Sequence, residues 1–342
     1  MKVTIAIPIY NAAKYVGAAL DSIAKQTFVD FECICVDDGS ADDSPEIAAR
    51  FVHSDPRFRL IRQPNAGPAA ARNHGIDDSS GEYLIFMDAD DVMSPYALET
   101  LVALADETQA DVVWGQHRRF AETDVFDPGE RRTDSKTFSG EKWLEWFDMR
   151  FSQEKTGDPF YGIPVLPWNK LIRRSSLGTM RFPTDRDVIG GDDAMFSSML
   201  LPKMSVVAVS ASVTYGYRMV GTSLNSIRMP IWLSRYSKAY ACVAENLRDR
   251  PSALRNYVHS ALRPGFIRQA IDAFVLSGRV WSEPESAQEL RRSFSRMLDA
   301  YSSVANAKLR LWLALGARGW WRVLAFLYRR SSLYRKSRAW PE

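Results

Sequence analysis

The sequence contains little cysteine and lacks any long apolar run. Its three cysteines, Cys33, Cys35 and Cys242, offer neither a disulfide framework nor the spacing of zinc ligands, so a reducing compartment is favoured. No stretch approaches the ~20 apolar residues that a membrane-spanning helix needs, and no signal peptide is recognisable at the N-terminus. We therefore expect a cytoplasmic protein that is not integral to a membrane.

Motifs of several common enzyme classes are also missing. The first predicted strand is followed by Pro8-Ile9-Tyr10-Asn11 rather than by G-x-G-x-x-G, which disfavours a dinucleotide-binding fold. The sequence has no phosphate-binding P-loop, no H-E-x-x-H zinc motif and no G-x-S-x-G nucleophile motif. The four histidines are scattered, and each is better interpreted as a surface or core residue than as a metal ligand.

The composition is that of a globular protein, but the charge is unevenly distributed. Of the 342 residues, 46% are hydrophobic and 25% are charged, which excludes a disordered or low-complexity chain and predicts about two domains. Residues 1–110 carry eight Lys and Arg against 18 Asp and Glu, whereas residues 300–342 carry nine against one. An acidic first part and a basic end indicate two different roles along the chain.

Strand and helix patterns alternate through the first 115 residues, which predicts βαβ units and a largely parallel sheet. Ser44-Pro45 and Ser94-Pro95 are interpreted as N-caps followed by a proline in the first helical turn. Residues 116–160 are expected to be irregular, and a helical pattern runs from Trp232 to Tyr328. The expected strands cover Val3–Pro8, Phe31–Val36, Phe58–Arg62, Tyr83–Met87 and Asp111–Trp114, and the expected helices cover Tyr15–Gln26, Pro45–Phe51, Pro68–Gly75 and Pro95–Glu107.

Two acidic clusters follow predicted strands, at Asp37–Asp38 and at Asp88–Asp91. Ligands bind beyond the carboxyl ends of the strands in a parallel α/β sheet, and carboxylates gathered there repel one another unless a cation joins them. Mg²⁺ or Mn²⁺, held by one or two carboxylates and by a diphosphate, would meet that requirement. The alternative is that the acids cap the following helices. Capping is the better interpretation for Asp42–Asp43, but it explains at most one acid of the second cluster.

Five separated motifs in the first 96 residues resemble family 2 glycosyltransferases, in the order and at the spacing of that family. The resemblance is dense over residues 3–96 and resumes at Pro167-Trp168-Asn169-Lys170-Leu171 and at Gly191-Asp192-Asp193-Ala194-Met195-Phe196. The motifs are Val3-Thr4-Ile5-Ala6-Ile7-Pro8-Ile9-Tyr10-Asn11, Val36-Asp37-Asp38-Gly39-Ser40, Asn65-Ala66-Gly67-Pro68, Ala71-Arg72-Asn73-His74-Gly75 and Phe86-Met87-Asp88-Ala89-Asp90-Asp91.

The resemblance implies a GT-A fold, a Rossmann-like α/β domain with a mostly parallel central sheet, extended here by a helical C-terminal region. It implies a nucleotide-sugar-binding half over residues 1–115, an acceptor-binding half over residues 116–225 and a helical region over residues 226–342. The implied reaction moves a sugar from a UDP-sugar to a hydroxyl group with inversion at the anomeric carbon, and it uses Mn²⁺ or Mg²⁺.

Roles for individual residues follow from the same resemblance. Tyr10 would stack near the base, and Asp38 would accept a hydrogen bond from the uracil N3–H. Asp90 would be the main metal ligand, while Asp88 would lie beside both the ribose and the metal. The implied nucleotide-sugar-binding residues are Pro8, Tyr10, Asp38, Arg72, Asp88 and Arg218, and the implied metal ligands are Asp90 and Asp88.

In this family an acidic pair followed by two residues and an aromatic supplies the catalytic base, and here Asp192-Asp193 precedes Phe196. We expect Asp193 to take the proton of the acceptor hydroxyl, with Asp192 as the alternative because the usual first residue is Glu. The pair could instead cap the helix that follows. Trp168 could stack on a sugar or belong to the core, and Arg218 could contact the diphosphate or face solvent.

Residues 306–338 form a basic tail with nine Lys and Arg, no acid, and tryptophans among leucines. A basic stripe beside such a face is typical of a helix in a membrane interface, and the alternative is a packed helix with solvated arginines. Nucleic acid is disfavoured because the acidic first part would repel it. Drawn as one helix, five basic residues fall within roughly 120°: Lys308, Arg318, Arg322, Arg329 and Arg330.

We therefore expect an inverting, metal-dependent glycosyltransferase that acts on a glycan or lipid-linked saccharide in bacterial surface polysaccharide synthesis. The basic tail predicts peripheral contact with the inner face of the cell membrane. The membrane spans and the Q-x-x-R-W motif of processive synthases are absent, which favours a single addition. The alternatives are a catalytically inactive membrane-associated scaffold and a sugar nucleotidyltransferase, although the latter needs a Gly-rich basic loop that residues 8–14 do not offer.

Overall fold

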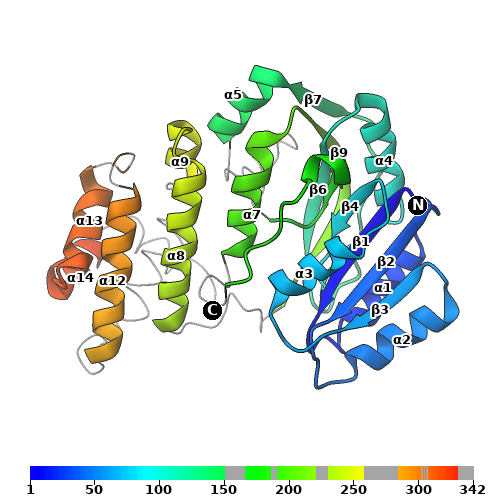
Figure 1. Ribbon diagram of the computed structural model, residues 1–342, viewed down its shortest axis with the longest axis horizontal. Coiled ribbons are helices and arrows are strands. Elements are labelled where there is room, and N and C mark those ends of the chain that lie inside the picture. The colour runs from blue at the N-terminus through cyan, green and yellow to red at the C-terminus, as the bar shows by residue number, and fades with distance from the viewer. Residues whose placement is uncertain are drawn as a thin grey trace.

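The computed structural model describes residues 1–150, 166–185, 191–220, 230–257, 284–301, 303, 305 and 307–329. These residues form an α/β part and a row of helices that extends from one side of it (Figure 1). The strands are β1 (Val3–Ile9), β2 (Phe31–Asp37), β3 (Phe58–Arg62), β4 (Tyr83–Phe86), β5 (Val92–Met93), β6 (Val112–Ala121), β7 (Ser135–Ser139), β8 (Lys170–Arg173) and β9 (Val206–Met219). The helices are α1 (Val16–Ala24), α2 (Ser44–Ser54), α3 (Pro68–Asp77), α4 (Ala97–Thr108), α5 (Gly140–Arg150), α6 (Arg174–Leu177), α7 (Asp192–Leu200), α8 (Pro230–Asn246), α9 (Pro251–Tyr257), α12 (Pro284–Tyr301), α13 (Ala307–Ala317) and α14 (Trp321–Arg329).

The described strands form one nine-stranded sheet in the order β3-β2-β1-β4-β8-β6-β9-β5, with β7 paired to β9. The pairs β1–β2, β1–β4, β2–β3 and β6–β9 are parallel, whereas β8, β7 and β5 join their neighbours antiparallel. At the carboxyl ends Ile9 pairs with Asp37, and Met87 donates its N–H to the carbonyl of Ala6. The segments that follow β1, β2 and β4 therefore leave the sheet at one edge.

The expected strands and helices of the first 115 residues are found, but both predicted N-caps are wrong. Ser44 lies inside α2, where its hydroxyl donates to Asp42 and accepts the N–H of Ala12. The Ser94 hydroxyl donates to the carbonyl of Val213 in β9. Both hydroxyls thus connect segments that are distant in the chain instead of satisfying the first turn of a helix.

The expectation that residues 116–160 are irregular is also wrong for the part that the structure describes. Strand β7 and helix α5 occupy residues 135–150, while residues 151–160 lie outside the described part. Trp143 is fully buried, and its ring lies among those of Trp114, Trp146 and Phe147. Burial of this aromatic cluster stabilises a helix whose surroundings in the sequence are polar.

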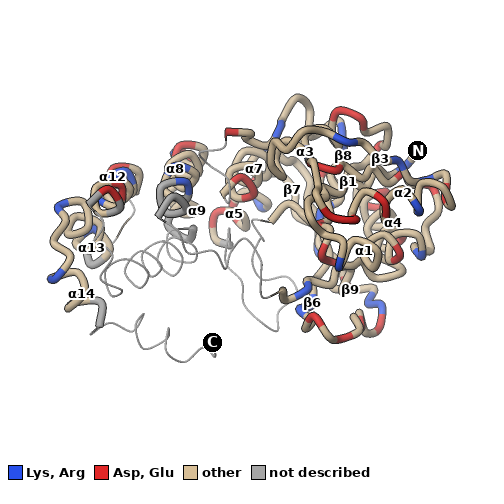
Figure 2. The backbone as a smooth tube through the Cα atoms, turned by 90° about the horizontal axis from the view of Figure 1, so that it is seen from below, with Lys and Arg blue, Asp and Glu red and all other residues tan. Residues whose placement is uncertain are grey.

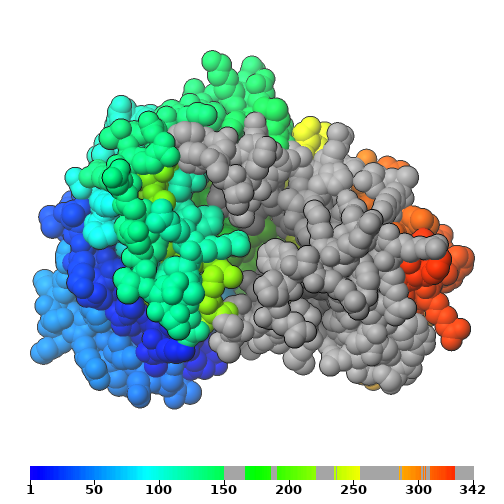
Figure 3. Space-filling model, turned by 180° about the vertical axis from the view of Figure 1, so that it is seen from behind, coloured from blue at the N-terminus to red at the C-terminus, as the bar shows by residue number. Residues whose placement is uncertain are grey.

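The helical C-terminal extension predicted from the sequence is present. One apolar cluster runs from Phe86 in the sheet through Phe196 of α7 and Val243 of α8 to Phe294 of α12 and Trp312 of α13. Figure 1 shows α7, α8, α12 and α13 side by side, in that order away from the sheet. Viewed from behind, α13 and α14 lie at the opposite end of the molecule from β1 and α2 (Figure 3). The helices therefore continue the core of the α/β part.

The basic tail is two helices and not the single helix on which the predicted stripe was drawn. Helix α13 ends at Ala317, and α14 begins at Trp321. Gly319 between them has φ +71°, in the left-handed region that favours glycine at the end of a helix. The predicted basic stripe from Lys308 to Arg329 is therefore divided between two helices. Residues 330–338 of the predicted tail lie outside the described part.

No helix within the described residues is both long enough and apolar enough to cross a membrane. The charge asymmetry of the sequence is visible in three dimensions: acidic segments gather over the α/β part, whereas α13 and α14 carry basic residues and no acid (Figure 2).

Candidate active site

The loop after β4 carries three acids, Asp88, Asp90 and Asp91, each in a different environment. Asp91 is buried, and both of its carboxylate oxygens are occupied: Oδ1 accepts the N–H of Arg218 at 2.8 Å, and Oδ2 accepts the hydroxyl of Tyr215 at 2.8 Å. The Tyr215 hydroxyl in turn accepts the N–H of Asp88 at 3.2 Å. Burial, with Asp88 and Asp90 nearby, raises the pKa of Asp91 well above its usual range. Asp91 therefore fixes the loop to β9, and its carboxylate is buried.

Asp90 and Asp88 keep oxygen atoms available. The Asp90 carboxylate accepts no hydrogen bond from the side chain of any described residue, and burial together with the Asp88 charge raises its pKa to about 6. Asp88 accepts one hydrogen bond, from Arg72, through Oδ1. Two neighbouring carboxylates with free oxygens suit a divalent cation that takes its other ligands from phosphate and water. Within the described residues no group of three or more His, Cys, Asp or Glu side chains could hold a metal by itself. The residues present therefore fit a cation that is bound together with a diphosphate.

Arg72 of α3 is the centre of the site. Its Nη2 donates to Asp88 Oδ1 at 2.9 Å, and its Nη1 donates to Asp193 Oδ1 at 3.1 Å and to Asp192 Oδ2 at 3.3 Å. The guanidinium lies over the ring of Phe182, 5.4 Å from its centroid, and is almost fully buried. Its Nε is buried and has no hydrogen-bond partner among the described residues. One guanidinium thus joins the acids after β4 to the acids that begin α7.

Asp193 is the acid of this cluster that the sequence motifs imply as the base. Its Oδ2 accepts no hydrogen bond from a described residue, and its side chain is partly exposed. Desolvation raises its pKa, Arg72 opposes that effect, and Asp192 and Asp88 add to it, so that the pKa is about 7. A carboxylate with a pKa near neutrality is suited to accept a proton from a hydroxyl group.

The alternative in which Asp192-Asp193 is an N-cap is wrong. Both residues belong to the first turn of α7, the N-cap position is Gly191, and no side-chain cap hydrogen bond is formed. Acids in the first turn still complement the helix dipole, but their carboxylates face Arg72. Asp192 and Asp193 are therefore counter-ions of the buried Arg72 guanidinium.

The residues expected on the nucleotide side lie along the same edge of the sheet. Asp38 is only 2% exposed; its Oδ1 accepts hydrogen bonds from Gln63 and from the N–H of Ala66, and its Oδ2 accepts the N–H of Gly67. Oδ2 is therefore the oxygen with room for a further donor. Tyr10, at the end of β1, is 54% exposed, and Pro8 is half-buried.

Arg218 of β9 also lies beside the loop after β4 that carries the candidate metal ligands Asp88 and Asp90. We call this loop the metal-candidate loop. Its Nε donates to the carbonyl of Asp90 at 2.8 Å, and its guanidinium lies 4.5 Å from the ring centroid of Phe120 and 5.7 Å from that of Tyr15. Arg218 is thus held between aromatic rings next to Asp90, and the interpretation as a solvent-facing arginine is wrong. Its positive charge opposes the rise in the pKa of Asp90.

Sequence reasoning missed the roles of Tyr215, Asp91 and Lys170. Lys170 is buried, and its charge opposes the rise in the pKa of Asp193. Trp168 is buried and stacks on Tyr215 with the ring centroids 4.6 Å apart, so the structure favours the core interpretation of this tryptophan. The alternation of Tyr215 and Tyr217 along one strand is the signal that these rings share a face.

Comparisons with known proteins agree with this architecture. The model of the family described as "Glycosyl transferase family 2" matches residues 4–180. Glycosyltransferase GlyA of Streptococcus pneumoniae serotype 4 is 32% identical over 232 residues, which are 68% of this chain and 32% of GlyA. The chain therefore spans about a third of the length of that relative.

Solved structures share the fold. TarS 1–349 of S. aureus in complex with UDP-GlcNAc has a TM-score of 0.70 at 18% identity, over 96% of this chain and 92% of that one. The mannosyltransferase PcManGT of Pyrobaculum calidifontis, in complex with GDP-Man and Mn²⁺, has a TM-score of 0.52 at 16% identity, over 96% of this chain and 86% of that one. The mixed α/β fold with a mostly parallel sheet is the GT-A fold that the sequence motifs imply.

Proposed function

The chain belongs to glycosyl transferase family 2, and from that premise we propose that it transfers a sugar from a UDP-sugar to a hydroxyl group of a glycan or lipid-linked saccharide, with inversion at the anomeric carbon. One observation carries the proposal. The guanidinium of Arg72 binds Asp88 and Asp193 at the same time. The candidate base, Asp193, therefore lies close to Asp88, which belongs to the candidate site for the leaving diphosphate. An inverting transfer needs these two functions on the two sides of the reacting carbon.

In the proposed reaction, the free Oδ2 of Asp193 takes the proton of the acceptor hydroxyl as its oxygen attacks the anomeric carbon. The new carbon–oxygen bond forms while the bond to the β-phosphate oxygen breaks, and the bonding electrons leave with the nucleoside diphosphate. Arg72 holds Asp193 in position, and Asp192 binds the same guanidinium. No second carboxylic acid is needed to protonate the leaving group, unlike in most glycoside hydrolases.

A divalent cation is part of the proposal. Asp90 and Asp88 would hold Mn²⁺ or Mg²⁺, whose charge would stabilise the departing diphosphate. Arg218 lies next to the Asp90 carbonyl and could contribute a second positive charge to the same group. The PcManGT complex contains Mn²⁺, which supports cation use in a protein of this fold.

The proposed nucleobase of the sugar donor is uracil. Oδ2 of Asp38 can accept one more hydrogen bond, and an ionised carboxylate accepts an N–H such as uracil N3–H but cannot donate to a base acceptor. Tyr10 and Pro8 lie at the same edge, where Tyr10 offers an exposed ring for stacking. The complexes of TarS 1–349 with UDP and with UDP-GlcNAc support the choice of UDP over GDP.

We extend the proposal to the whole chain. Residues 1–115 would form the nucleotide-sugar half, residues 116–225 the acceptor half, and residues 226–342 a helical region that brings the enzyme to the inner face of a bacterial membrane. A lipid-linked acceptor for surface polysaccharide would be found there. This assignment of the acceptor depends on the basic tail of the sequence.

A donor assay tests the proposal. The chain is incubated with Mn²⁺ and UDP-glucose, UDP-galactose or UDP-GlcNAc, with and without a lipid-linked saccharide, and the released UDP is measured. Asp193→Asn should lower the rate by about 10²–10⁴-fold, while the exposed acid Asp124→Asn serves as the control. UDP binding without any turnover, unaltered by Mn²⁺, would favour the inactive scaffold, and consumption of a nucleoside triphosphate would favour a nucleotidyltransferase.

A further inference from the structure

Helices α13 and α14 and the turn between them present large apolar side chains to solvent. Trp320 is 56% exposed and Leu311 is 49% exposed, and Val323 and Phe326 are exposed as well. On the other face of these two helices Trp312, Leu313, Trp321 and Leu324 are buried against the core that α12 contributes to. The exposed residues are therefore held on a packed scaffold. We call them, with the arginines described next, the tail surface.

Four arginines belong to the same helices, to the turn between them or to a helix that contacts this turn. Arg310 is exposed on α13, Arg318 is exposed in the turn that follows this helix, and Arg322 lies in the first turn of α14. Arg291 of α12 reaches the same turn, because a Cβ added to Gly319 would lie 2.2 Å from its Nε. None of the four makes an ion pair with a described residue, whereas Arg292 of α12 is paired with Glu289.

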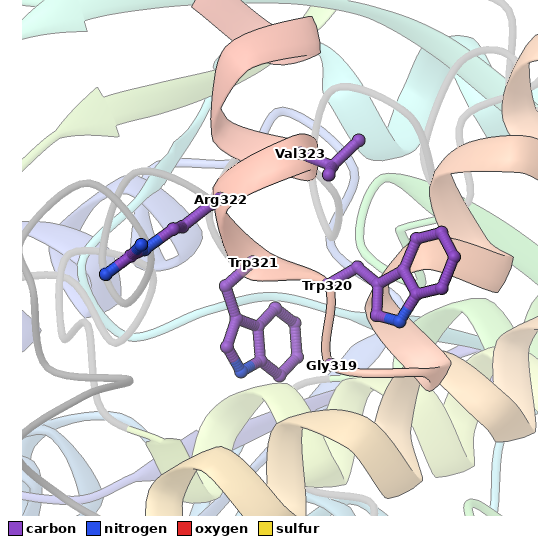
Figure 4. Close-up of a pocket in the computed structure, with 5 residues that line it drawn as sticks. All are labelled: Gly319, Trp320, Trp321, Arg322 and Val323. Atoms are coloured by element: carbon purple, nitrogen blue, oxygen red, sulfur yellow. The ribbon is translucent and has the colours of Figure 1, made fainter.

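Figure 4 shows how these side chains leave the turn. Trp320 and Val323 project to one side of α14, Arg322 projects to the other side, and Trp321 turns toward the helices beneath. Gly319–Val323 also line a shallow hollow at this point. Positive charge thus lies on the same two helices as the apolar groups, and no acid is present in α13 or α14 to neutralise it.

From this arrangement we propose that the tail surface docks onto an anionic lipid bilayer, with Trp320, Leu311 and their neighbours in the interface and the arginines at the headgroups. Tryptophan is suited to the interface because its ring is apolar and its N–H is polar. Arginine can bury its apolar stem and keep its charge at the surface. The inference deepens the proposed function, since it names the residues that would bring the enzyme to a lipid-linked acceptor, but the binding itself does not require that activity.

Charge excludes the two other natural occupants of such a surface. A second copy would have to place the same cationic face against itself in a two-fold interface, which brings unpaired arginines together. Nucleic acid would approach a chain whose first 110 residues carry 18 acids against eight basic residues, and that negative charge would repel it.

Vesicle sedimentation of the full chain tests the inference. Phosphatidylcholine vesicles are compared with vesicles that contain phosphatidylglycerol as well, at low and at high salt. The test variants are Trp320→Ser and the double variant Arg318→Gln with Arg322→Gln. The controls are Val125→Ser, which is 93% exposed on the α/β part, and Arg50→Gln, an exposed arginine on α2.

We expect the wild-type chain to bind the anionic vesicles at least tenfold more strongly than the neutral ones. The double arginine variant should lose that preference at unchanged UDP affinity, and Trp320→Ser should bind more weakly. Both controls should behave as the wild type does. High salt should reduce the binding. Equal binding to neutral and anionic vesicles, or test variants that bind as the controls do, would overturn the inference. So would a dimer in solution that the test variants abolish. If the wild-type chain binds vesicles but does not bind UDP, the result counts against the proposed function and not against this inference.

Discussion

Nη1 of Arg72 lies 3.1 Å from Oδ1 of Asp193, although 121 positions separate the two residues in the chain. The same guanidinium binds Asp88 through Nη2. A buried arginine whose two Nη nitrogens bind three carboxylates has little capacity left for a substrate phosphate, because its Nε, which has no partner among the described residues, is buried. We therefore interpret Arg72 as a positioning residue for the base and the metal-candidate loop, and not as the direct nucleotide contact that the family resemblance implies.

Arg72→Lys should separate these two interpretations. Lysine keeps the positive charge but cannot bridge acids on two sides with a planar fork. We expect turnover to fall by about 10²-fold because Asp193 is misplaced, with a smaller effect on UDP affinity. Steady-state kinetics and calorimetry on the same preparation measure the two effects. A variant that loses UDP affinity while its turnover at saturating donor is kept would show that Arg72 contacts the nucleotide.

Removing the charge altogether should destabilise the fold. In Arg72→Met three neighbouring acids lose their shared counter-ion, and breaking such a buried cluster costs about 3–5 kcal/mol. Chemical unfolding of the variant measures the loss, with Arg59→Met as the control because Arg59 pairs with Asp78 in an exposed position. Equal stability of the two variants would contradict the central role given to Arg72.

The rate of transfer should depend on pH through Asp193. Its pKa of about 7 means that the carboxylate is mostly protonated, and inactive as a base, at pH 6. We expect the rate to rise with pH, with a midpoint near 7, and to level off above pH 8. Folding stability should show the opposite trend. The folded state binds more protons than the unfolded state between the two pKa values, so this group's contribution falls as the pH rises from about 4 to 7. Rates at saturating donor from pH 5.5 to 9 test the first trend, and a flat profile would exclude Asp193 as the base.

Tyr215→Phe should loosen the loop that carries Asp88 and Asp90. The change removes the hydrogen bond to Asp91 and the acceptor for the Asp88 N–H. Leaving the buried Asp91 oxygen without its donor costs about 1–3 kcal/mol. Tyr83→Phe is the matched control, because the Tyr83 ring is equally buried but its hydroxyl binds the exposed acid Asp106. Unfolding curves and Mn²⁺ affinity are the measurements. If both variants behave alike, Tyr215 has no special role in holding the loop.

Asp38→Asn should weaken nucleotide binding. The amide replaces an ionised acceptor that holds Gln63, Ala66 and Gly67, and hydrogen bonds to a charged group contribute about 1.5–3 kcal/mol each. We expect UDP affinity to fall at least about tenfold, by that principle. Asp43→Asn, an exposed acid after the same strand that forms no side-chain cap, should leave the affinity unchanged. Unchanged affinity in Asp38→Asn would remove Asp38 from the base-binding site.

Local patterns sufficed for the α/β part. The apolar, β-branched run at Val3–Ile9 and the Pro68 start of α3 specify their elements through short-range chemistry, and the strand ends locate the acids. The bond between Arg72 and Asp193 could not be predicted in this way, because it depends on how α3 and α7 pack. The same holds for Tyr215 and Asp91, which belong to segments joined only by the sheet.

The C-terminal part shows why a helical projection can fail. The sequence predicts one continuous helix for the basic residues of the tail, whereas α13 ends at Ala317, Gly319 has a left-handed φ, and Trp321 begins a second helix. A glycine is a weak signal in the sequence, because glycine is tolerated inside helices, and Gly316 lies within α13. Burial of Trp312 and Trp321 against α12 decides the geometry, and such packing is not encoded in a local period.

The central claim is that Asp88 and Asp90 bind a nucleoside diphosphate through a divalent cation. Calorimetric titration of UDP with and without Mn²⁺, on the wild-type chain, on Asp90→Asn and on the exposed-acid control Glu46→Gln, tests it most directly. We expect Mn²⁺ to tighten UDP binding in the wild type and in the control but not in Asp90→Asn. The same UDP affinity with and without Mn²⁺ in the wild type, or a full gain in Asp90→Asn, would contradict it.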